Sequence, residues 1–174
     1  MPSSLSLTHV IYDESSLISL GMAYITLAPL ALMICFVPLL LFERGLKFRN
    51  TFIFFVGQLL NRVLNTLLKK IFKEERPLLD GSARKDYGWP SDHGQFMAFF
   101  TIAFWWWLSQ RREVERPLRV LLQVGVVVGT VLVSWSRIYL GYHDWWQVGG
   151  GLVVGTLGGY LFVAVARRLV AKRS

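Results

Sequence analysis

The sequence predicts an all-α protein: a polytopic membrane helix bundle of about five transmembrane helices, with its functional site at helix ends on one membrane face. Two observations carry this prediction. Apolar residues make up 53% of the 174 residues, and they are gathered in five long blocks that are nearly free of charge. The residue types that perform chemistry lie instead in three short clusters at block ends, all on the same predicted side of the membrane.

The five blocks justify the five helices in order. The first block runs for 28 uncharged residues between Glu14 and Glu43, and the last runs for 22, at 145–166. The second block, at 50–68, contains a single charge, and the two remaining blocks are uncharged for 17 residues each. Since a span needs roughly 17–25 apolar residues, we expect one membrane-embedded domain over 1–174. Its spans are expected at about 16–42, 50–70, 92–110, 118–137 and 145–167.

The net charge of +8 indicates an anionic partner. Because the cations lie in short loops between apolar blocks, anionic lipid headgroups or a phosphorylated lipid fit better than nucleic acid, which we do not expect to bind. With five spans, one side of the membrane carries eleven Lys and Arg residues and the other carries seven. The positive-inside rule places the side with eleven in the cytoplasm. The chain before the first block lacks the basic region of a cleavable signal peptide, so the first span is expected to remain as an anchor.

The first cluster, KKIFKEERP at 69–77, has six residues between Lys69 and Arg76. Asn61 and Asn65 precede Lys69 at intervals of four, so the three side chains share one helical face. Two interpretations stay open. The cations form a basic collar at a helix end while the Asn side chains bond neighbouring helices, or the cations hold an anion and the Asn side chains line a substrate groove.

The second cluster, WPSDHGQ at 89–95, stands at the mouth of an apolar run. Ser91 or Asp92 is a suitable N-cap for the helix that follows. The N–H groups of a first helical turn, together with the helix dipole, form an anion site. The simpler alternative is an ordinary helix cap with His93 at the membrane interface.

The third cluster, SWSRIYLGYHDWWQVGGG at 134–151, has five residues between Arg137 and His143. An Arg at the end of a membrane helix is costly unless it meets an anion. That anion is either Asp144 or a bound ligand. The glycines at 149–151 and 155–159 indicate close helix packing rather than a phosphate-binding loop.

Together the three clusters supply three cations, a helix N-terminus, a hydroxyl group and two histidines on one membrane face. This set suffices for phosphoryl transfer without a metal. Arg offers paired donors to phosphate oxygens. One neutral histidine can attack phosphorus, and a protonated one can donate to the leaving oxygen. We therefore expect neither a metal nor another cofactor.

The order K-x6-RP, P-S-x-H and S-R-x5-H resembles the type 2 phosphatidic acid phosphatase superfamily of membrane lipid phosphatases. The segments LTHVIY (7–12), YGWPSDHGQFMAFF (87–100) and SWSRIYLGYHDWWQVGGG (134–151) are most similar to the branch that hydrolyses dolichyl diphosphate. The resemblance covers most of residues 7–160. It implies conversion of that lipid to dolichyl phosphate on the lumenal face of the endoplasmic reticulum membrane, which recycles the lipid carrier for protein N-glycosylation.

The resemblance also implies a role for each motif residue. His143 is the nucleophile that forms a phosphohistidine, and His93 protonates the leaving group and then activates water. The reacting phosphate is held by Lys69, Arg76, Ser91, Arg137 and the backbone N–H groups near Asp92 and His93.

Two positions depart from the superfamily pattern. Position 92 is usually Gly or Ser, and a carboxylate such as Asp92 repels a phosphate unless it points away or pairs with a cation. Gln147 stands four residues after His143, where the superfamily usually has Asp. Because Gln147 and His143 share a helical face, we expect the amide oxygen to accept from the imidazole N–H and fix its tautomer. A bond from Gln147 to a neighbouring helix is the alternative.

Three other functions stay open on the sequence alone. Another polyprenyl-diphosphate or glycerolipid phosphatase carries the same motifs. A non-catalytic lipid-binding protein on the same fold is the alternative from a different class. A metal hydrolase is the third, although the three cations would repel its metal, and its ligands would be Asp92, His93, His143 and Asp144.

Overall fold

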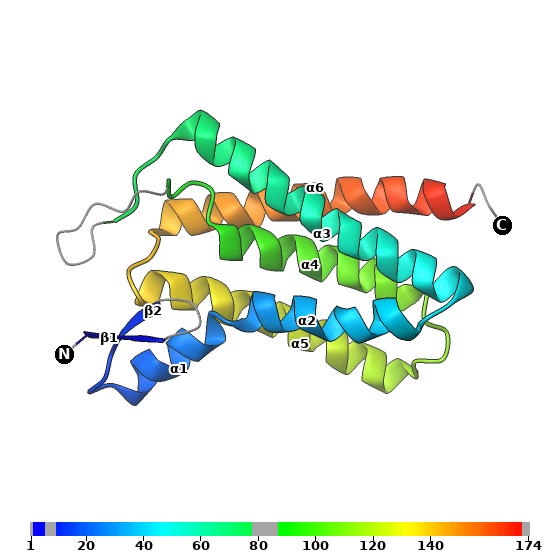
Figure 1. Ribbon diagram of the computed structural model, residues 1–174, viewed down its shortest axis with the longest axis horizontal. Coiled ribbons are helices and arrows are strands. Elements are labelled where there is room, and N and C mark those ends of the chain that lie inside the picture. Colours follow the sequence, from blue (N-terminus) through cyan, green and yellow to red (C-terminus); the bar gives the residue numbers. More distant parts are fainter. Residues whose placement is uncertain (1, 6–9, 78–86, 172–174) are drawn as a thin grey trace.

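Figure 1 shows the computed structural model, which describes residues 2–5, 10–77 and 87–171. An antiparallel hairpin of β1 (Pro2–Leu5) and β2 (Val10–Asp13) precedes the helices. The helices follow in the order α1 (Leu17–Ile25), α2 (Ala28–Phe42), α3 (Gly45–Phe72), α4 (Asp92–Ser109), α5 (Arg116–Tyr139) and α6 (Trp145–Ala171). The predicted all-α helix bundle is confirmed, and the short hairpin is an addition that the sequence did not indicate. The segment 7–12 lies partly outside the described residues.

The predicted spans correspond to these helices, with one internal break. By length and composition, three of the described helices suit a membrane span, namely α3, α5 and α6. Helices α1 and α2 form a fourth candidate that is bent by 41°. The break falls at Thr26 and Leu27, just before Pro29, which has no N–H to continue the hydrogen-bonding pattern of α1. The remaining predicted span, 92–110, corresponds to α4, which is not among these candidates. The count of five spans therefore stays a prediction.

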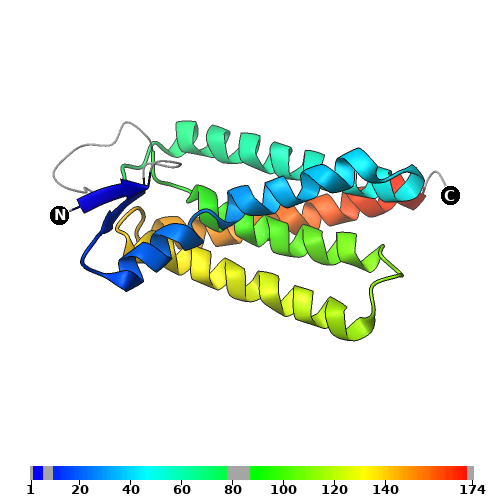
Figure 2. The same ribbon diagram turned by 60° about the horizontal axis from the view of Figure 1, so that its bottom comes forward.

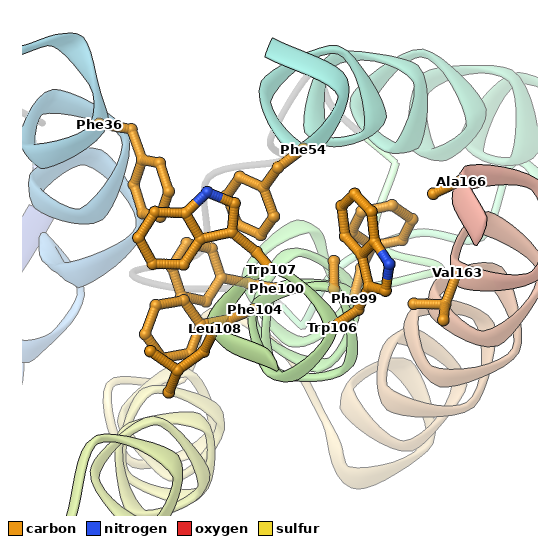
Figure 3. Close-up of a cluster of buried hydrophobic side chains, with 11 residues drawn as sticks. Phe36, Phe54, Phe99, Phe100, Phe104, Trp106, Trp107, Leu108, Val163 and Ala166 are labelled. Carbon is orange, nitrogen blue, oxygen red and sulfur yellow. The ribbon is translucent and has the colours of Figure 1, made fainter. Parts of the chain in front are cut away.

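Helix α4 forms the centre of the bundle, and its side chains, most of them aromatic, make up most of the core (Figure 3). On one side, Phe100 lies edge-on to Phe54 of α3, with ring centroids 5.3 Å apart. On another side, Phe99 packs against Phe162 of α6, also at 5.3 Å. Because buried aromatic rings contribute strongly to core stability, α4 is fixed between α3 and α6, and so is its first turn.

The contact between α4 and α6 is close because α6 carries a glycine every four residues. Gly151, Gly155 and Gly159 face α4. A Cβ atom at Gly155 would collide with the carbonyl oxygen of Gln95, and one at Gly151 would lie 2.6 Å from the carbonyl oxygen of Ser91. The helix packing predicted from these glycines is therefore confirmed, with the two backbones in direct contact.

The two ends of the bundle differ in what they carry (Figures 1 and 2). The end with the hairpin holds the C-terminal ends of α3 and α5 and the first turns of α4 and α6. The opposite end holds the α2–α3 turn, the α4–α5 connection and the C-terminus. We call these the hairpin end and the opposite end.

A partly buried ion pair closes the opposite end. The two terminal nitrogens of Arg111 lie 2.5 and 2.9 Å from the two carboxylate oxygens of Glu43. The Thr51 hydroxyl donates to Glu43 at 2.6 Å and accepts from Arg111 at 2.6 Å and from the Trp107 indole at 2.9 Å. The Trp107 ring also lies 4.3 Å from the guanidinium. Because the Arg111 side chain is only 5% exposed, this Arg111–Glu43 pair ties α2 and α3 to the end of α4 inside the structure.

Candidate active site

The fold brings the three predicted clusters together at the hairpin end (Figure 1). The first cluster lies at and after the end of α3, the second at the start of α4, and the third at the end of α5 and the start of α6. The candidate residues lie in the last turn of α3 (Lys69), after α3 (Arg76), at the start of α4 (Ser91, Asp92, His93), in the last turn of α5 (Arg137) and at the start of α6 (His143, Gln147).

A tight turn between α5 and α6 sets the position of His143. Gly141 has φ of 70°, a left-handed conformation that favours glycine, and it follows the last turn of α5. The Arg137 carbonyl oxygen accepts from the N–H groups of Tyr142 and His143 at 2.9 and 3.2 Å. The Tyr142 ring lies 4.1 Å from the Arg137 guanidinium, and its hydroxyl accepts from Ile11 N–H at 2.7 Å. Through Tyr142, the hairpin therefore supports the turn that joins Arg137 to His143.

The imidazole of His143 is oriented by the side chain of Gln147. His143 is 2% exposed, and its Nδ1 lies 2.8 Å from Gln147 Oε1. Gln147 Nε2 donates to the Glu74 carboxylate at 3.1 Å and to the Glu75 carbonyl at 2.7 Å. Because the amide nitrogen faces two acceptors, the amide oxygen must face His143 and accept from Nδ1–H. A proton on Nδ1 leaves a free lone pair on Nε2, which is the state that a nucleophile needs.

The surroundings of His143 keep it neutral. Burial lowers the pKa of His143 to about 3. Three nearby cations act in the same direction: Arg76, Arg137 and Lys69. These are the three cations that the sequence assigns to the phosphate, so the structure places them close enough to His143 to act on its charge. A neutral imidazole among cations is suited to attack an anionic phosphate.

The first turn of α4 holds a polar group without a partner. Ser91 occupies the N-cap position, but its hydroxyl makes no capping hydrogen bond. The Ser91 side chain is fully buried, and its Oγ has no hydrogen-bond partner among the described residues. Its backbone N–H donates to the Gln147 carbonyl at 2.9 Å, which holds the start of α4 against α6. A buried hydroxyl without a partner is unfavourable unless a ligand engages it. The predicted binding of phosphate by Ser91 needs a hydroxyl group in this state.

Asp92 pairs with two cations from α3. One carboxylate oxygen accepts from Lys69 Nζ at 3.0 Å, and the other lies 3.0 Å from Arg62 Nη1. The Arg62 contact is an ion pair without hydrogen-bond geometry, because Asp92 Oδ1 has no hydrogen-bond donor in the described structure. A carboxylate at position 92 was expected to repel a phosphate unless it paired with a cation, and Asp92 has such partners. It also occupies Lys69, so a bound phosphate must share or replace the contact.

Two adjoining cavities lie beside Asp92. The larger, of about 290 Å³, is mostly polar and is lined by Arg62, Asn65, Thr66, Lys69, Lys70, Tyr87 and Asp92. The smaller, of about 90 Å³, is lined by Pro29, Asn61, Arg62, Asn65, Asp92, His93, Gln95 and Phe96. The two share Arg62, Asn65 and Asp92. The two cavities are therefore neighbours on either side of these three side chains.

Asn61 and Asn65 belong to a buried amide network. Asn65 Nδ2 donates to Gln95 Oε1 at 2.9 Å and to the Pro90 carbonyl at 3.1 Å. Gln95 Nε2 donates to Asn61 Oδ1 at 2.8 Å. These bonds join α3 to the start of α4 and match the alternative in which the Asn side chains bond a neighbouring helix. Asn65 also lines both cavities and Asn61 lines the smaller one, so a groove role stays a prediction.

His93 faces the break in the first predicted span. Its ring is in hydrogen-bonding contact with the backbone of Thr26, the residue that ends α1. Carbonyl groups at the end of a helix have no partner within that helix, and the break therefore provides an acceptor for the imidazole. His93 also lines the smaller cavity, next to Phe96.

The described residues offer no ligand set for a metal: no three His, Cys, Asp or Glu side chains gather there as a metal site requires. Asp144 Oδ1 accepts from the Gln147 backbone N–H at 2.8 Å and so caps α6. Asp92 is paired with Lys69 and Arg62. The two carboxylates of the metal-hydrolase alternative thus have other partners.

Three residues at the site were not singled out from the sequence: Arg62, Glu74 and Gln95. Arg62 is the only charge in its apolar block, and that isolation is the signal that could have identified it. Gln95 and Glu74 carry no such signal, because an amide within a helix and an acidic residue in a loop are both common.

The fold and the site define a membrane helix bundle with cations and two histidines gathered at one end. The family model of the PAP2 superfamily matches residues 50–171, and the chain belongs to this superfamily. The crystal structure of the first transmembrane PAP2 type phosphatidylglycerolphosphate phosphatase from Bacillus subtilis has the same fold. It is 21% identical with a TM-score of 0.71, and the match covers 85% of this chain and 76% of that one.

Among curated proteins, the chain is similar to dolichyldiphosphatases. It is 37% identical to Dolichyldiphosphatase 1 of Rhinolophus ferrumequinum over 161 residues, which cover 87% of this chain and 66% of that protein. It is 36% identical to Dolichyldiphosphatase 1 of Homo sapiens over 168 residues, covering 91% and 68%. It is 30% identical to Dolichyldiphosphatase of Saccharomyces cerevisiae over 172 residues, covering 93% and 71%. The chain thus spans about two thirds of the length of these relatives.

Proposed function

We propose that this chain is an integral membrane lipid phosphatase that hydrolyses dolichyl diphosphate to dolichyl phosphate and phosphate. The observation that carries the proposal is the state of His143: it is buried, its Nδ1 is held by Gln147, and three cations lie nearby. The similarity to dolichyldiphosphatases, at 30% to 37% identity, supports the choice of substrate. The reaction is proposed to occur on the lumenal face of the endoplasmic reticulum membrane, where it recycles the lipid carrier for protein N-glycosylation.

In the first step the terminal phosphate of the substrate becomes attached to His143. The Nε2 lone pair attacks the terminal phosphorus, and the bond from phosphorus to the bridging oxygen breaks. His93 gives a proton to the departing dolichyl phosphate. The donors that hold the transferring phosphate and stabilise its charge are Lys69, Arg76, Arg137, Ser91 and the first N–H groups of α4.

In the second step water hydrolyses the phosphohistidine. His93, now neutral, takes a proton from the water, whose oxygen attacks phosphorus. The bond to Nε2 breaks, phosphate leaves and neutral His143 is restored. The Gln147 oxygen keeps its hydrogen bond to Nδ1–H throughout, so the same tautomer returns for the next cycle.

The two cavities support a lipid substrate. The larger one is next to Lys69 and takes the phosphates, and the smaller one takes the first part of the apolar chain beside Phe96 and His93. We infer that the leaving oxygen then lies next to His93, which lines the smaller cavity. Asn61 and Asn65 then line the groove on the lipid side.

Phosphate release by the purified protein tests the proposal. We expect the highest kcat/KM with dolichyl diphosphate, compared with dolichyl phosphate, undecaprenyl diphosphate and phosphatidic acid. Activity should survive EDTA, and vanadate should inhibit because it resembles the trigonal-bipyramidal transition state. A preference for phosphatidic acid would contradict the substrate, and absence of release from every lipid would contradict the function.

The orientation has its own test in microsomes. A glycosylation acceptor inserted next to Gly81 should be modified, and one inserted next to Arg112 should not. The opposite pattern would place the site in the cytosol.

A further inference from the structure

Glu74 connects the end of α3 with the first turn of α6. It follows Lys73, whose φ of 51° turns the chain away from α3. Its Oε1 accepts from Gln147 Nε2 at 3.1 Å, and its Oε2 accepts from Trp146 Nε1 at 3.2 Å. Its carbonyl oxygen accepts from Gly88 N–H at 2.6 Å. Both carboxylate oxygens therefore have partners on α6, the helix that begins beside the nucleophile.

The position of Glu74 determines which way the Gln147 amide faces. An amide has nearly the same shape in its two orientations, so hydrogen bonds select between them. In the reverse orientation, the amide oxygen would face the Glu74 carboxylate and the Glu75 carbonyl, which are both acceptors. Its NH2 group would face His143 Nδ1 and would require a lone pair there. The imidazole proton would then move to Nε2, and the nucleophilic lone pair would be lost.

Glu74 also supplies a negative charge that the amide lacks. When Nε2 of His143 becomes phosphorylated, the imidazole carries a positive charge that a neutral amide stabilises poorly. A carboxylate that accepts from Gln147 Nε2 polarises the amide and makes Oε1 a stronger acceptor. Gln147 is fully buried and Glu74 is half-buried, so water screens this effect only in part. The carboxylate itself is stabilised near the N-terminus of α6.

We propose that Glu74 is a positioning residue for His143, which holds the Gln147 amide in the productive orientation and adds the charge that the superfamily's Asp supplies directly. The role rests on the proposed function of His143 as the nucleophile. Gly88 completes the arrangement, because a Cβ there would collide with the Gln147 amide. The Gln147 amide is thus in contact with Glu74 and Glu75 on one side of this loop and with Gly88 on the other.

Glu75 provides a matched control. Its carbonyl group, and not its carboxylate, contacts Gln147, and it is exposed. Glu75→Gln therefore removes one charge from the same loop and keeps every described contact of the amide. Glu74→Gln removes the charge but keeps an acceptor for Nε2, and Glu74→Ala removes both.

Kinetics on the purified variants give the first readout. We expect Glu74→Ala to lower kcat about 10- to 100-fold with KM changed less than about twofold, as is typical of a lost orienting partner. Glu74→Gln should lower kcat roughly fivefold, the difference between a charged and a neutral hydrogen bond. Glu75→Gln should match wild type. Rapid-quench measurements should show slower phosphoenzyme formation in the Glu74 variants. If kcat per folded molecule equals that of Glu75→Gln and only the thermal midpoint falls, Glu74 is structural and the proposal is overturned.

The tautomer of His143 gives a second readout that does not depend on activity. The protein has three histidines, so 15N spectra of labelled protein resolve them, and a His143→Gln variant assigns the signal. We expect Nδ1–H in wild type and Glu75→Gln, and a population of Nε2–H in Glu74→Ala. If Glu74→Ala does not fold, Glu74→Gln decides through its kcat. If dolichyl diphosphate is not the substrate, the wild-type protein will prefer another lipid. An unchanged tautomer of His143 in Glu74→Ala would refute only the positioning role of Glu74.

Discussion

Both ends of the bundle contain a carboxylate held by cations, but the two ends use it differently. At the opposite end, Arg111 and Glu43 meet through two pairs of atoms. At the hairpin end, Asp92 is divided between Lys69 and Arg62, with one contact to each. The Arg111 side chain is 5% exposed, whereas the Arg62 side chain is 64% exposed and lines both cavities.

The opposite end is a cluster that joins helices, and the hairpin end is a cluster that we propose binds a ligand. Around Arg111, the partner hydroxyl of Thr51 uses its donor and both acceptor positions, and only Nε of the guanidinium lacks a partner. Near His143, the Ser91 hydroxyl is buried without a partner in the described chain. Substitutions at the opposite end should therefore affect stability, and substitutions at the hairpin end should affect turnover.

The largest expected effect is that of His143→Ala. Without the proposed nucleophile, kcat should fall roughly 10⁴-fold or more. Phosphate release and acid-quenched trapping of phosphoenzyme measure the loss. A phosphoenzyme that still forms in this variant would place the nucleophile elsewhere.

At the opposite end, Arg111→Met should lower the free energy of unfolding by up to about 3 kcal/mol, the lower end of the range for a fully buried pair, because it leaves the partly buried Glu43 carboxylate without its partner. Turnover per folded molecule should stay at the wild-type value. The double variant Arg111→Met with Glu43→Met should recover most of the stability. Normal stability combined with reduced turnover would break the distinction between the two ends.

At the hairpin end, Gln147→Ala should lower turnover about 10- to 100-fold, as expected for the loss of an orienting partner. The alternative is that Gln147 only joins α6 to the loop after α3, and then stability falls while turnover per folded molecule stays normal. Measuring both quantities on one sample separates the two outcomes. Unchanged turnover would mean that another group orients His143.

The pKa of His143 predicts a pH dependence of stability. Burial lowers this pKa to about 3, whereas the unfolded value is about 6.5. Between these values the unfolded chain binds more protons, so stability falls as the pH is lowered below about 6.5, by at most about 1.4 kcal/mol per pH unit. Thermal midpoints from pH 7 to pH 4.5 should fall less in His143→Gln than in wild type. Parallel curves would show that His143 does not resist protonation.

The smallest expected effect is that of Asp92→Asn. Because the carboxylate occupies Lys69 in the free protein, its removal should lower KM for the diphosphate by roughly two- to fivefold, on the scale of a partly exposed ion pair. Glu113→Gln is the matched control, since it breaks an exposed pair with Lys47 at the opposite end. An increase in KM would instead mean that Asp92 positions Lys69 for the substrate.

Much of the fold follows from the sequence because uncharged blocks of this length have few alternatives to membrane helices. The break at Thr26 was not predicted. The first block is uncharged throughout, and Pro29 alone is a weak signal because membrane helices tolerate proline. The hairpin was also missed, because pairing of two four-residue strands leaves no periodicity long enough to recognise.

The site could be predicted as far as its contacts are local in the chain. The spacing of four residues correctly anticipated the contact between His143 and Gln147. The partners of Asp92 and Gln147 were harder, because they depend on how α3 is rotated against α4 and α6. Glu74 lies 73 residues from Gln147, and no periodicity links positions that far apart.

The glycines of α6 determine how far apart the two histidines are. His93 belongs to the first turn of α4 and His143 lies one residue before the cap of α6, and these helices touch backbone to backbone at Gly151 and Gly155. The distance between these two proposed catalytic side chains is therefore set by rigid helices rather than by loops. A single methyl group at Gly155, roughly 15 Å along the helix axis from the start of α6, would push the helices apart and separate the proposed acid from the proposed nucleophile. The proposed catalytic geometry at one end of the bundle thus depends on the absence of side chains deep inside it.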